Sequence, residues 1–117
     1  ELNIKNKVIF KDYVLNPLPY IKNSSLYLSF SDFEGQPNSV IQSLACGTKT
    51  IVKYFPGIEN IKKLNNLEVV YNLELSKISK NITKILIKKR KNNINNKIIK
   101  AFGEVQYFKN FLKLINE

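Results

Sequence analysis

The residues best suited to do chemistry lie in one short stretch, at Glu34, Gly35 and Pro37. The apolar run over 26–30 before them predicts a strand. A helix would then start at Pro37, because the fixed φ of proline suits the first helical position and its missing N–H is not needed there. The helix would end at Gly47 in a left-handed cap. Its apolar face would consist of Val40, Ile41, Leu44 and Ala45. A strand, an acidic turn with a glycine and a helix N-terminus predict an anion site of the kind that α/β proteins build.

The rest of the chain supplies elements that would position this turn. Strands are predicted over 8–10, 26–30, 50–52 and 67–71, where β-branched and aromatic residues gather. The predicted helical segments are a helix capped by Asn16 with Pro17 at its first position, one or two turns over 58–64, a helix from the N-cap Ser76, a shorter helix over 97–102 that stops at Gly103, and a last helix over 105–115. This alternation implies a parallel α/β layer. We predict part of a doubly wound parallel sheet that is covered on both faces and closed by C-terminal helices, with ligands at the carboxyl ends of the strands.

The composition excludes several classes of site. The chain has one cysteine and no histidine, so an internal disulfide and a histidine-based catalytic triad are excluded, and a zinc site is not expected. Cys46, just before a glycine that ends a helix, is interpreted as a small buried residue rather than a nucleophile. We therefore expect no metal.

The length of 117 residues suits one domain spanning 1–117. No apolar run approaches the roughly 20 residues that a membrane span requires, and the first residues lack the pattern of a signal peptide. A cytoplasmic location is expected, compatible with contact at the inner face of the membrane. Because the chain starts at Glu1 rather than methionine, we expect a fragment or a processed piece.

The net charge of +10 raises the alternative of a nucleic-acid or anionic-membrane partner. Lysine, asparagine and isoleucine are all abundant, however, which is typical of AT-rich genomes, and no aromatic RNA-binding signature accompanies the charge. The basic run over 88–91 fits the end of the helix that starts near Ser76, where the macrodipole favours cations. We expect no nucleic-acid partner, whereas peripheral attachment to anionic lipid stays compatible.

At this point the sequence resembles a known family, the retaining glycosyl transferases group 1 family (glycosyltransferase family 4, GT-B fold), in its C-terminal half. The resemblance runs from Val8 nearly to the end of the chain. It is carried by Val8-Ile-Phe10 and Tyr13-Val14, by Ser31-Asp-Phe-Glu-Gly-Gln-Pro-Asn-Ser-Val-Ile-Gln-Ser-Leu-Ala-Cys-Gly47, by Ile51-Val52 and by Pro56-Gly57-Ile58-Glu59. The resemblance implies a Rossmann-like domain that binds a nucleotide-sugar donor in a cleft closed by an N-terminal domain.

The resemblance also implies roles for individual residues. Glu34 would be the catalytic glutamate that contacts the transferred sugar. Tyr13 and Val14 would line the base of the nucleotide. The donor would also meet the backbone N–H groups of a turn and helix start. This segment would consist of Gly35, Gln36, Pro37, Asn38 and Ser39. Gln42 stands where the family has a second glutamate that holds ribose hydroxyls, so an amide replaces a carboxylate there. Lys49 and Asp12 are further departures, at positions where the family usually has proline and glycine.

The implied function is transfer of a hexosyl-type sugar, with retention, from a UDP- or GDP-linked donor to a glycan, lipid or polysaccharide precursor. The family generally needs no metal or other cofactor in this role. The cationic pair that holds the diphosphate and the acceptor-binding N-terminal domain would lie before Glu1, so the chain would supply a half-site. Two alternatives stay open: a non-catalytic nucleotide-sugar-binding or degenerate scaffold domain, and a nucleic-acid or membrane-surface module. The base, the sugar and the acceptor are left open by these residues.

Overall fold

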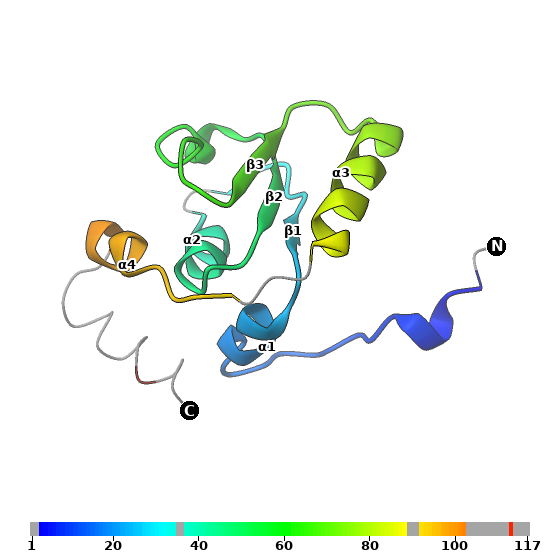
Figure 1. The fold of residues 1–117 in the computed structure, drawn as a ribbon, viewed down its shortest axis with the longest axis horizontal. Helices are drawn as coiled ribbons and strands as arrows, with labels where there is room; N and C mark the ends of the chain where they lie inside the picture. The colour runs from blue at the N-terminus through cyan, green and yellow to red at the C-terminus, as the bar shows by residue number, and fades with distance from the viewer. Residues whose placement is uncertain (1–2, 35–36, 89–91, 103–112, 114–117) are drawn as a thin grey trace.

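A parallel sheet of three short strands lies at the centre of the fold (Figure 1). The strands are β1 (Tyr27–Ser29), β2 (Thr50–Lys53) and β3 (Leu67–Val70), in the spatial order β1-β2-β3. Tyr27 pairs with Thr50, and Thr50 pairs with Leu67. Parallel neighbours need long crossover connections, which helix α2 supplies between β1 and β2 and a series of turns supplies between β2 and β3. The predicted parallel α/β class is confirmed at this level.

The computed structural model describes residues 3–34, 37–88, 92–102 and 113. The helical elements are η1 (Lys5–Lys7), α1 (Leu18–Asn23), α2 (Asn38–Ala45), η2 (Pro56–Ile58), α3 (Leu75–Ile87) and α4 (Asn96–Phe102), where η denotes a 3-10 helix. The predicted helix over 105–115 and the stop at Gly103 lie outside the described residues, as do Gly35 and Gln36.

Helix α2 covers one face of the sheet and packs into the hydrophobic core. Val40, Leu44 and Ala45 are fully buried, which is the apolar face expected from their spacing. The hydroxyl groups of Ser43 and Thr50 lie 2.7 Å apart, so even the polar atoms between helix and β2 are paired. The same cluster includes α1 and α4 through Leu18, Ile21, Ile98 and Ile99.

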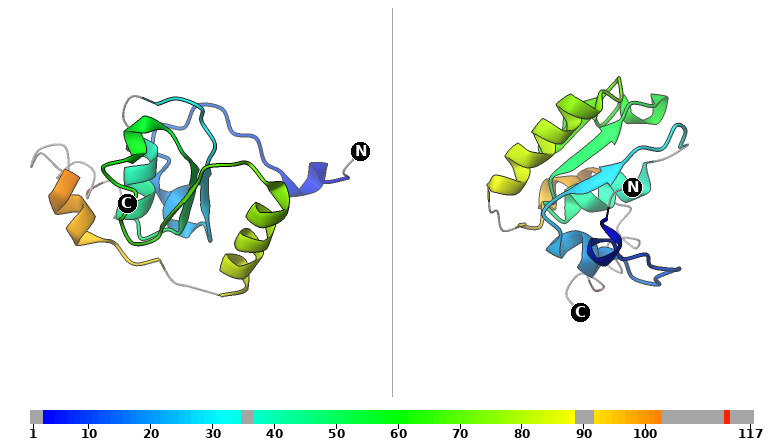
Figure 2. Two further views of the ribbon diagram at one scale, coloured as in Figure 1. Left: turned by 90° about the horizontal axis from the view of Figure 1, so that it is seen from above. Right: turned by 90° about the vertical axis from the view of Figure 1, so that its right-hand side faces the viewer.

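Helix α3 lies along the opposite face (Figure 2). Its Asn81 side chain donates to a carboxylate oxygen of Glu68 on β3. Glu68 pairs in register with Ile51, which is fully buried but does not belong to the cluster around α2. Ile78 is the buried residue of α3. The sheet therefore has a helix on each face, as predicted, although α3 buries much less than α2.

Asparagine side chains and one glycine fix the ends of the helices. Asn16 Oδ1 accepts from the N–H of Leu18 at 3.2 Å, but the N-cap residue of α1 is Pro17, so Asn16 and Pro17 each stand one position before the places predicted for them. Gly47 has φ +77°, in the left-handed region predicted for the end of α2. The segment around Asn92 and Asn95 crosses the ends of α1 and α2. Asn95 N–H donates to Ala45 O at 2.8 Å, and Asn92 Nδ2 donates to the backbone oxygens of Lys22 and Ser24, each at 2.7 Å.

Three expectations about the elements are wrong. The predicted strand over 8–10 is extended chain outside the sheet, and Phe10 is 93% exposed. The apolar, β-branched pattern was insufficient because no strand of the described residues pairs with it. The coverage of β1 is incomplete, since Leu28 and Phe30 remain 42% and 40% exposed at the edge of the sheet.

The third correction concerns helix starts. Helix α3 begins at Leu75 with Glu74 as its N-cap residue, not at Ser76, whose hydroxyl donates to Glu74 Oε1 at 3.2 Å. Pro37 likewise precedes the first helical residue, Asn38, by one position. The basic run begins at Lys88, the C-cap residue of α3, as the macrodipole argument predicted; the rest of that run lies outside the described residues.

Candidate functional site

The predicted catalytic glutamate lies in the loop at the carboxyl end of β1. Glu34 is half-buried, and its Oε1 accepts a hydrogen bond from the Ser31 hydroxyl at 2.9 Å. In the same loop, Asp32 pairs with Lys53, the last residue of β2. This ion pair joins the carboxyl ends of two neighbouring strands, although its partly exposed position makes its contribution to stability small. The loop thus holds one carboxylate that a hydroxyl orients, on Glu34, and a second carboxylate, on Asp32, that is paired with the Lys53 ammonium group.

The first turn of α2 follows this loop, as the sequence predicted. Pro37 is buried, whereas Asn38 is exposed and Ser39 is half-buried. Among the described residues, no side chain caps the helix. The first N–H groups of a helix lack partners within the helix and carry the positive end of its dipole. The first turn of α2 can therefore receive an anionic group beside Glu34.

A largely apolar pocket of about 340 Å³ lies beside α2 and α1. We call it the α1–α2 pocket. Three of the predicted donor residues line it: Val14, Ser39 and Gln42. Ser39 and Gln42 stand three positions apart on α2, so their side chains share one face of that helix. The structure thus brings together residues from two segments that are 25 positions or more apart in the sequence.

Other predicted residues do not reach this pocket. Tyr13 is 90% exposed and does not line it, so the predicted contact of Tyr13 with a base has no support in the structure. Asn38 and Glu34 also lie outside its lining. They belong instead to the loop and first turn at the start of α2, which leads into the pocket at Ser39.

Sequence reasoning missed several residues of the α1–α2 pocket. Its walls include Tyr20 of α1, Tyr27 of β1 and Lys11. Lys11 Nζ lies 5.8 Å from the centroid of the Tyr20 ring, within range of a cation–π contact. The aromatic residues carry no local signal of a pocket, because one belongs to a short helix and the other to a strand. Only the packing of α1 against α2 brings them together.

A second cluster lies at the carboxyl ends of β2 and β3. The rings of Tyr54 and Tyr71 stack with centroids 4.9 Å apart. A hydrogen bond to Glu59 raises the pKa of Tyr54, and the neighbouring Lys62, at 2.5 Å from Glu59, lowers the pKa of the Glu59 carboxyl. Glu59 belongs to the Pro56–Glu59 segment of the resemblance. Its carboxylate is held ionised and oriented, and the ring of Tyr71 is exposed beside it.

Cys46 is fully buried, as predicted, and burial raises the pKa of its thiol to about 11. Within the described residues, no group of three histidine, cysteine, aspartate or glutamate side chains could hold a metal ion. The same part of the chain contains no helix of the length and apolarity that crossing a bilayer demands.

The fold and these contacts define a small α/β protein with a three-stranded parallel sheet and polar groups at the carboxyl ends of its strands. No family model matches the chain, and neither the curated proteins nor the solved structures provide a match.

Proposed function

We propose that the chain forms the donor-binding part of a retaining glycosyltransferase with a GT-B fold. It would hold a nucleotide sugar while the sugar passes to a glycan, lipid or polysaccharide precursor. The observation that carries this proposal is the α1–α2 pocket, which brings Val14, Ser39 and Gln42 together directly beside the first turn of α2. Val14 belongs to one segment of the family resemblance, and Ser39 and Gln42 belong to another.

The shape and chemistry of the pocket suit a nucleoside. Its volume of about 340 Å³ falls in the range of small-molecule sites, roughly 300–1,000 Å³. Tyr20 and Tyr27 offer aromatic surface to a base. The Gln42 amide can both donate to and accept from ribose hydroxyls, since it carries an NH₂ group and a carbonyl oxygen. Lys11 adds a cation at the wall of the pocket.

The order of groups along α2 matches the order of parts in a nucleotide sugar. Gln42 lies four residues, or about 6 Å along the axis, from the first helical residue Asn38. Glu34 precedes that residue in the loop after β1. A donor with its ribose at Gln42 would place its diphosphate at the first turn, where N–H groups and the dipole favour negative charge. Its sugar would then lie towards Glu34.

The same arrangement suits the chemistry of retaining transfer. Negative charge grows on the leaving diphosphate as the sugar departs, and dipoles already aimed at that position stabilise it without reorganising. The first turn of α2 supplies such dipoles. Glu34, oriented by the Ser31 hydroxyl, would hold the transferred sugar through its hydroxyl groups. The acceptor and further cations would come from the N-terminal domain that the GT-B architecture implies.

The test is a titration of the 117-residue chain with UDP- and GDP-linked sugars by calorimetry. Gln42→Glu should tighten binding by about threefold to tenfold, because a charged acceptor roughly doubles the strength of each ribose hydrogen bond. Gln42→Ala should weaken it by a similar factor. Asn60→Ala is the matched control, since Asn60 is an exposed amide that does not line the pocket, and it should change nothing.

Two outcomes would overturn the proposal. One is the absence of saturable binding by any UDP- or GDP-linked sugar. The other is a Glu34→Ala variant that changes neither the affinity of the chain nor the turnover of the complete gene product.

The replacement of the family's ribose-binding glutamate by Gln42 favours one alternative, a nucleotide-sugar-binding domain without catalysis. Both functions require donor binding in the α1–α2 pocket. Turnover separates them: the enzyme loses turnover with Glu34→Ala, whereas the non-catalytic domain binds the donor and shows no turnover in the unmodified gene product.

A further inference from the structure

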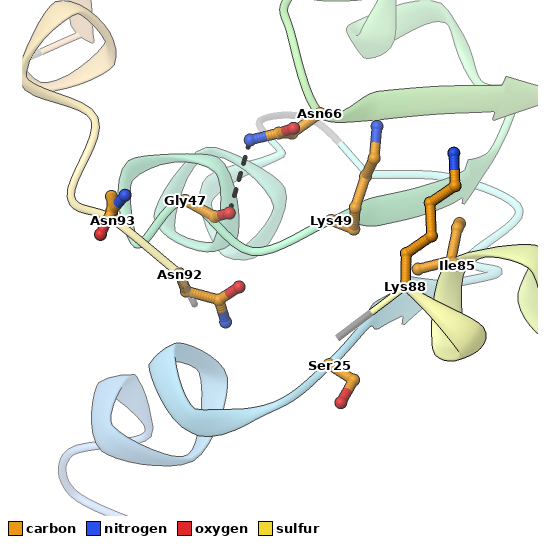
Figure 3. A pocket seen from close by; sticks show the side chains of 8 residues that line it. All are labelled: Ser25, Gly47, Lys49, Asn66, Ile85, Lys88, Asn92 and Asn93. Atoms are coloured by element: carbon orange, nitrogen blue, oxygen red, sulfur yellow. Dashed lines mark hydrogen bonds between the residues drawn. The ribbon is translucent and has the colours of Figure 1, made fainter. Parts of the chain in front are cut away.

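A second pocket, of about 230 Å³, opens at the amino ends of the strands (Figure 3). We call it the amino-edge pocket, because Ser25, Lys49 and Asn66 precede β1, β2 and β3 and so stand at the amino ends of the strands. The described residues that line it are Ser25, Gly47, Lys49, Asn66, Ile85, Lys88, Asn92 and Asn93. The predicted donor residues at the carboxyl edge do not contribute to it.

The charged groups of this pocket are positive in the part of the chain that the structure describes. Lys49 and Lys88 line it, and no carboxylate of the described residues does. Neither lysine takes part in the ion pairs that the described residues form. Figure 3 shows the two side chains extending in the same direction on one side of the pocket. Two ammonium groups in one pocket repel each other. A bound anion would attract both of them and so offset that repulsion.

Apart from Ile85, the remaining described lining is polar or backbone, and two of its asparagines are held in place by hydrogen bonds to the backbone. Asn66 adopts φ +72°, and its backbone oxygen accepts from Thr50 N–H at 2.8 Å while its Nδ2 donates to Gly47 O at 3.4 Å. The side-chain amide of Asn92 is fixed by its two bonds to the backbone oxygens at the end of α1. Ser25 is exposed, and in Figure 3 its hydroxyl points away from the ammonium groups of the two lysines. A preorganised wall of this kind lowers the entropic cost of binding a ligand.

We propose that the amino-edge pocket binds the phosphate group of an anionic ligand. Lysine ammonium groups bind phosphate as point charges, and hydrogen bonds between charged partners are about twice as strong as neutral ones. The volume greatly exceeds the roughly 30 Å³ that a water molecule occupies, so it accommodates a phosphate or diphosphate group. The phosphate could belong to a free phosphate compound or to a lipid headgroup. The site does not depend on the proposed function, since the two pockets share no described lining residue.

The first arm of the test is an NMR titration of the ¹⁵N-labelled 117-residue chain with inorganic pyrophosphate. Saturable shifts are expected at the backbone amides of Ser25, Gly47 and Asn66. Lys49→Ala and Lys88→Ala should each weaken the binding about tenfold, the loss typical of one charge-assisted bond.

The second arm measures co-sedimentation with phosphatidylcholine vesicles, with and without phosphatidylglycerol. Binding only to pyrophosphate identifies a soluble phosphate compound as the ligand. Binding to phosphatidylglycerol vesicles that the Lys49→Ala/Lys88→Ala double variant loses identifies a headgroup. Either result supports the site.

The matched control is the double variant Lys80→Ala/Lys84→Ala, which changes exposed residues of α3 outside the lining. Both doubles carry a net charge of +10 − 2 = +8. A second pair of variants compares Lys88→Glu, in the pocket, with Lys84→Glu, outside it. Both side chains are exposed, so neither charge reversal should prevent folding. Equal losses in the pocket and control variants would show diffuse charge attraction and overturn the proposal, as would the absence of saturation in both arms.

Discussion

Replacing Gly47 by alanine should destabilise the fold strongly, because two separate costs meet at this residue. Its φ of +77° lies in the left-handed region, which costs a residue with a Cβ about 1–2 kcal/mol. A Cβ at this position would also collide with the backbone carbonyl group of Asn93. Backbone cannot rotate away as a side chain can, so relief requires a shift of the segment, at about 1–3 kcal/mol.

Together these costs amount to about 2–5 kcal/mol, a large share of the 5–15 kcal/mol by which a domain is stable. The assay is urea unfolding followed by circular dichroism. With an m value of about 1.5 kcal/mol per M, a loss of about 3 kcal/mol lowers the midpoint by about 2 M at an unchanged slope. Because Asn95 N–H bonds to Ala45 O just before the glycine, the shift should also loosen the contact between α4 and α2.

Two further variants separate the costs. Gly57→Ala is the matched control, since Gly57 does not have a positive φ, and it should change the free energy of unfolding little. Gly47→Asn should recover about 1 kcal/mol relative to alanine, because asparagine tolerates the left-handed conformation but still carries a Cβ. The reasoning fails if Gly47→Ala costs no more than Gly57→Ala.

Two other predictions concern titrating groups. Burial raises the pKa of Cys46 to about 11, so its thiol should react with a thiol-specific reagent only as fast as the chain unfolds; rapid labelling of the folded chain would contradict this. Because the folded pKa exceeds that of a free thiol, about 8.5, the contribution of Cys46 to stability is complete below that pH and is lost as the pH rises towards 11. The hydrogen bond to Glu59 raises the pKa of Tyr54, so Glu59→Gln should shift part of the tyrosinate absorbance titration to lower pH. Glu74→Gln, which alters a carboxylate bonded to Ser76 and Lys77, should leave that titration unchanged, and an equal effect of both variants would refute the assignment.

The two ends of the strands differ in charge. The carboxyl ends of the strands carry mixed charges, with Asp32 paired to Lys53 and Glu59 paired to Lys62. Among the described residues, the charged side chains that line the amino-edge pocket are the two lysines Lys49 and Lys88. Two of the 19 basic residues of the chain therefore share one defined pocket.

Local sequence patterns determined the elements that depend on neighbours along the chain. The spacing of apolar residues on α2 and the left-handed glycine at position 47 were both readable, because helix faces and caps are set within a few residues. The strands that became β1, β2 and β3 were also readable from their β-branched and aromatic composition. The positions of Glu34 at a strand end and Ser39 in the first turns of α2 follow directly from these elements.

Tertiary structure decided everything that depends on which segments meet. The run over 8–10 has the composition of a strand, yet a strand exists only where a partner accepts its hydrogen bonds, and none of the described residues does so. The asparagines near position 92 looked like a simple break, but Asn92 ties the end of α1 to the segment before α4. Tyr20 joins Gln42, and Lys49 joins Lys88, only because helices and strands from distant parts of the chain pack side by side. Sequence spacing encodes periodicity along one element, whereas a pocket is a property of the surfaces between elements.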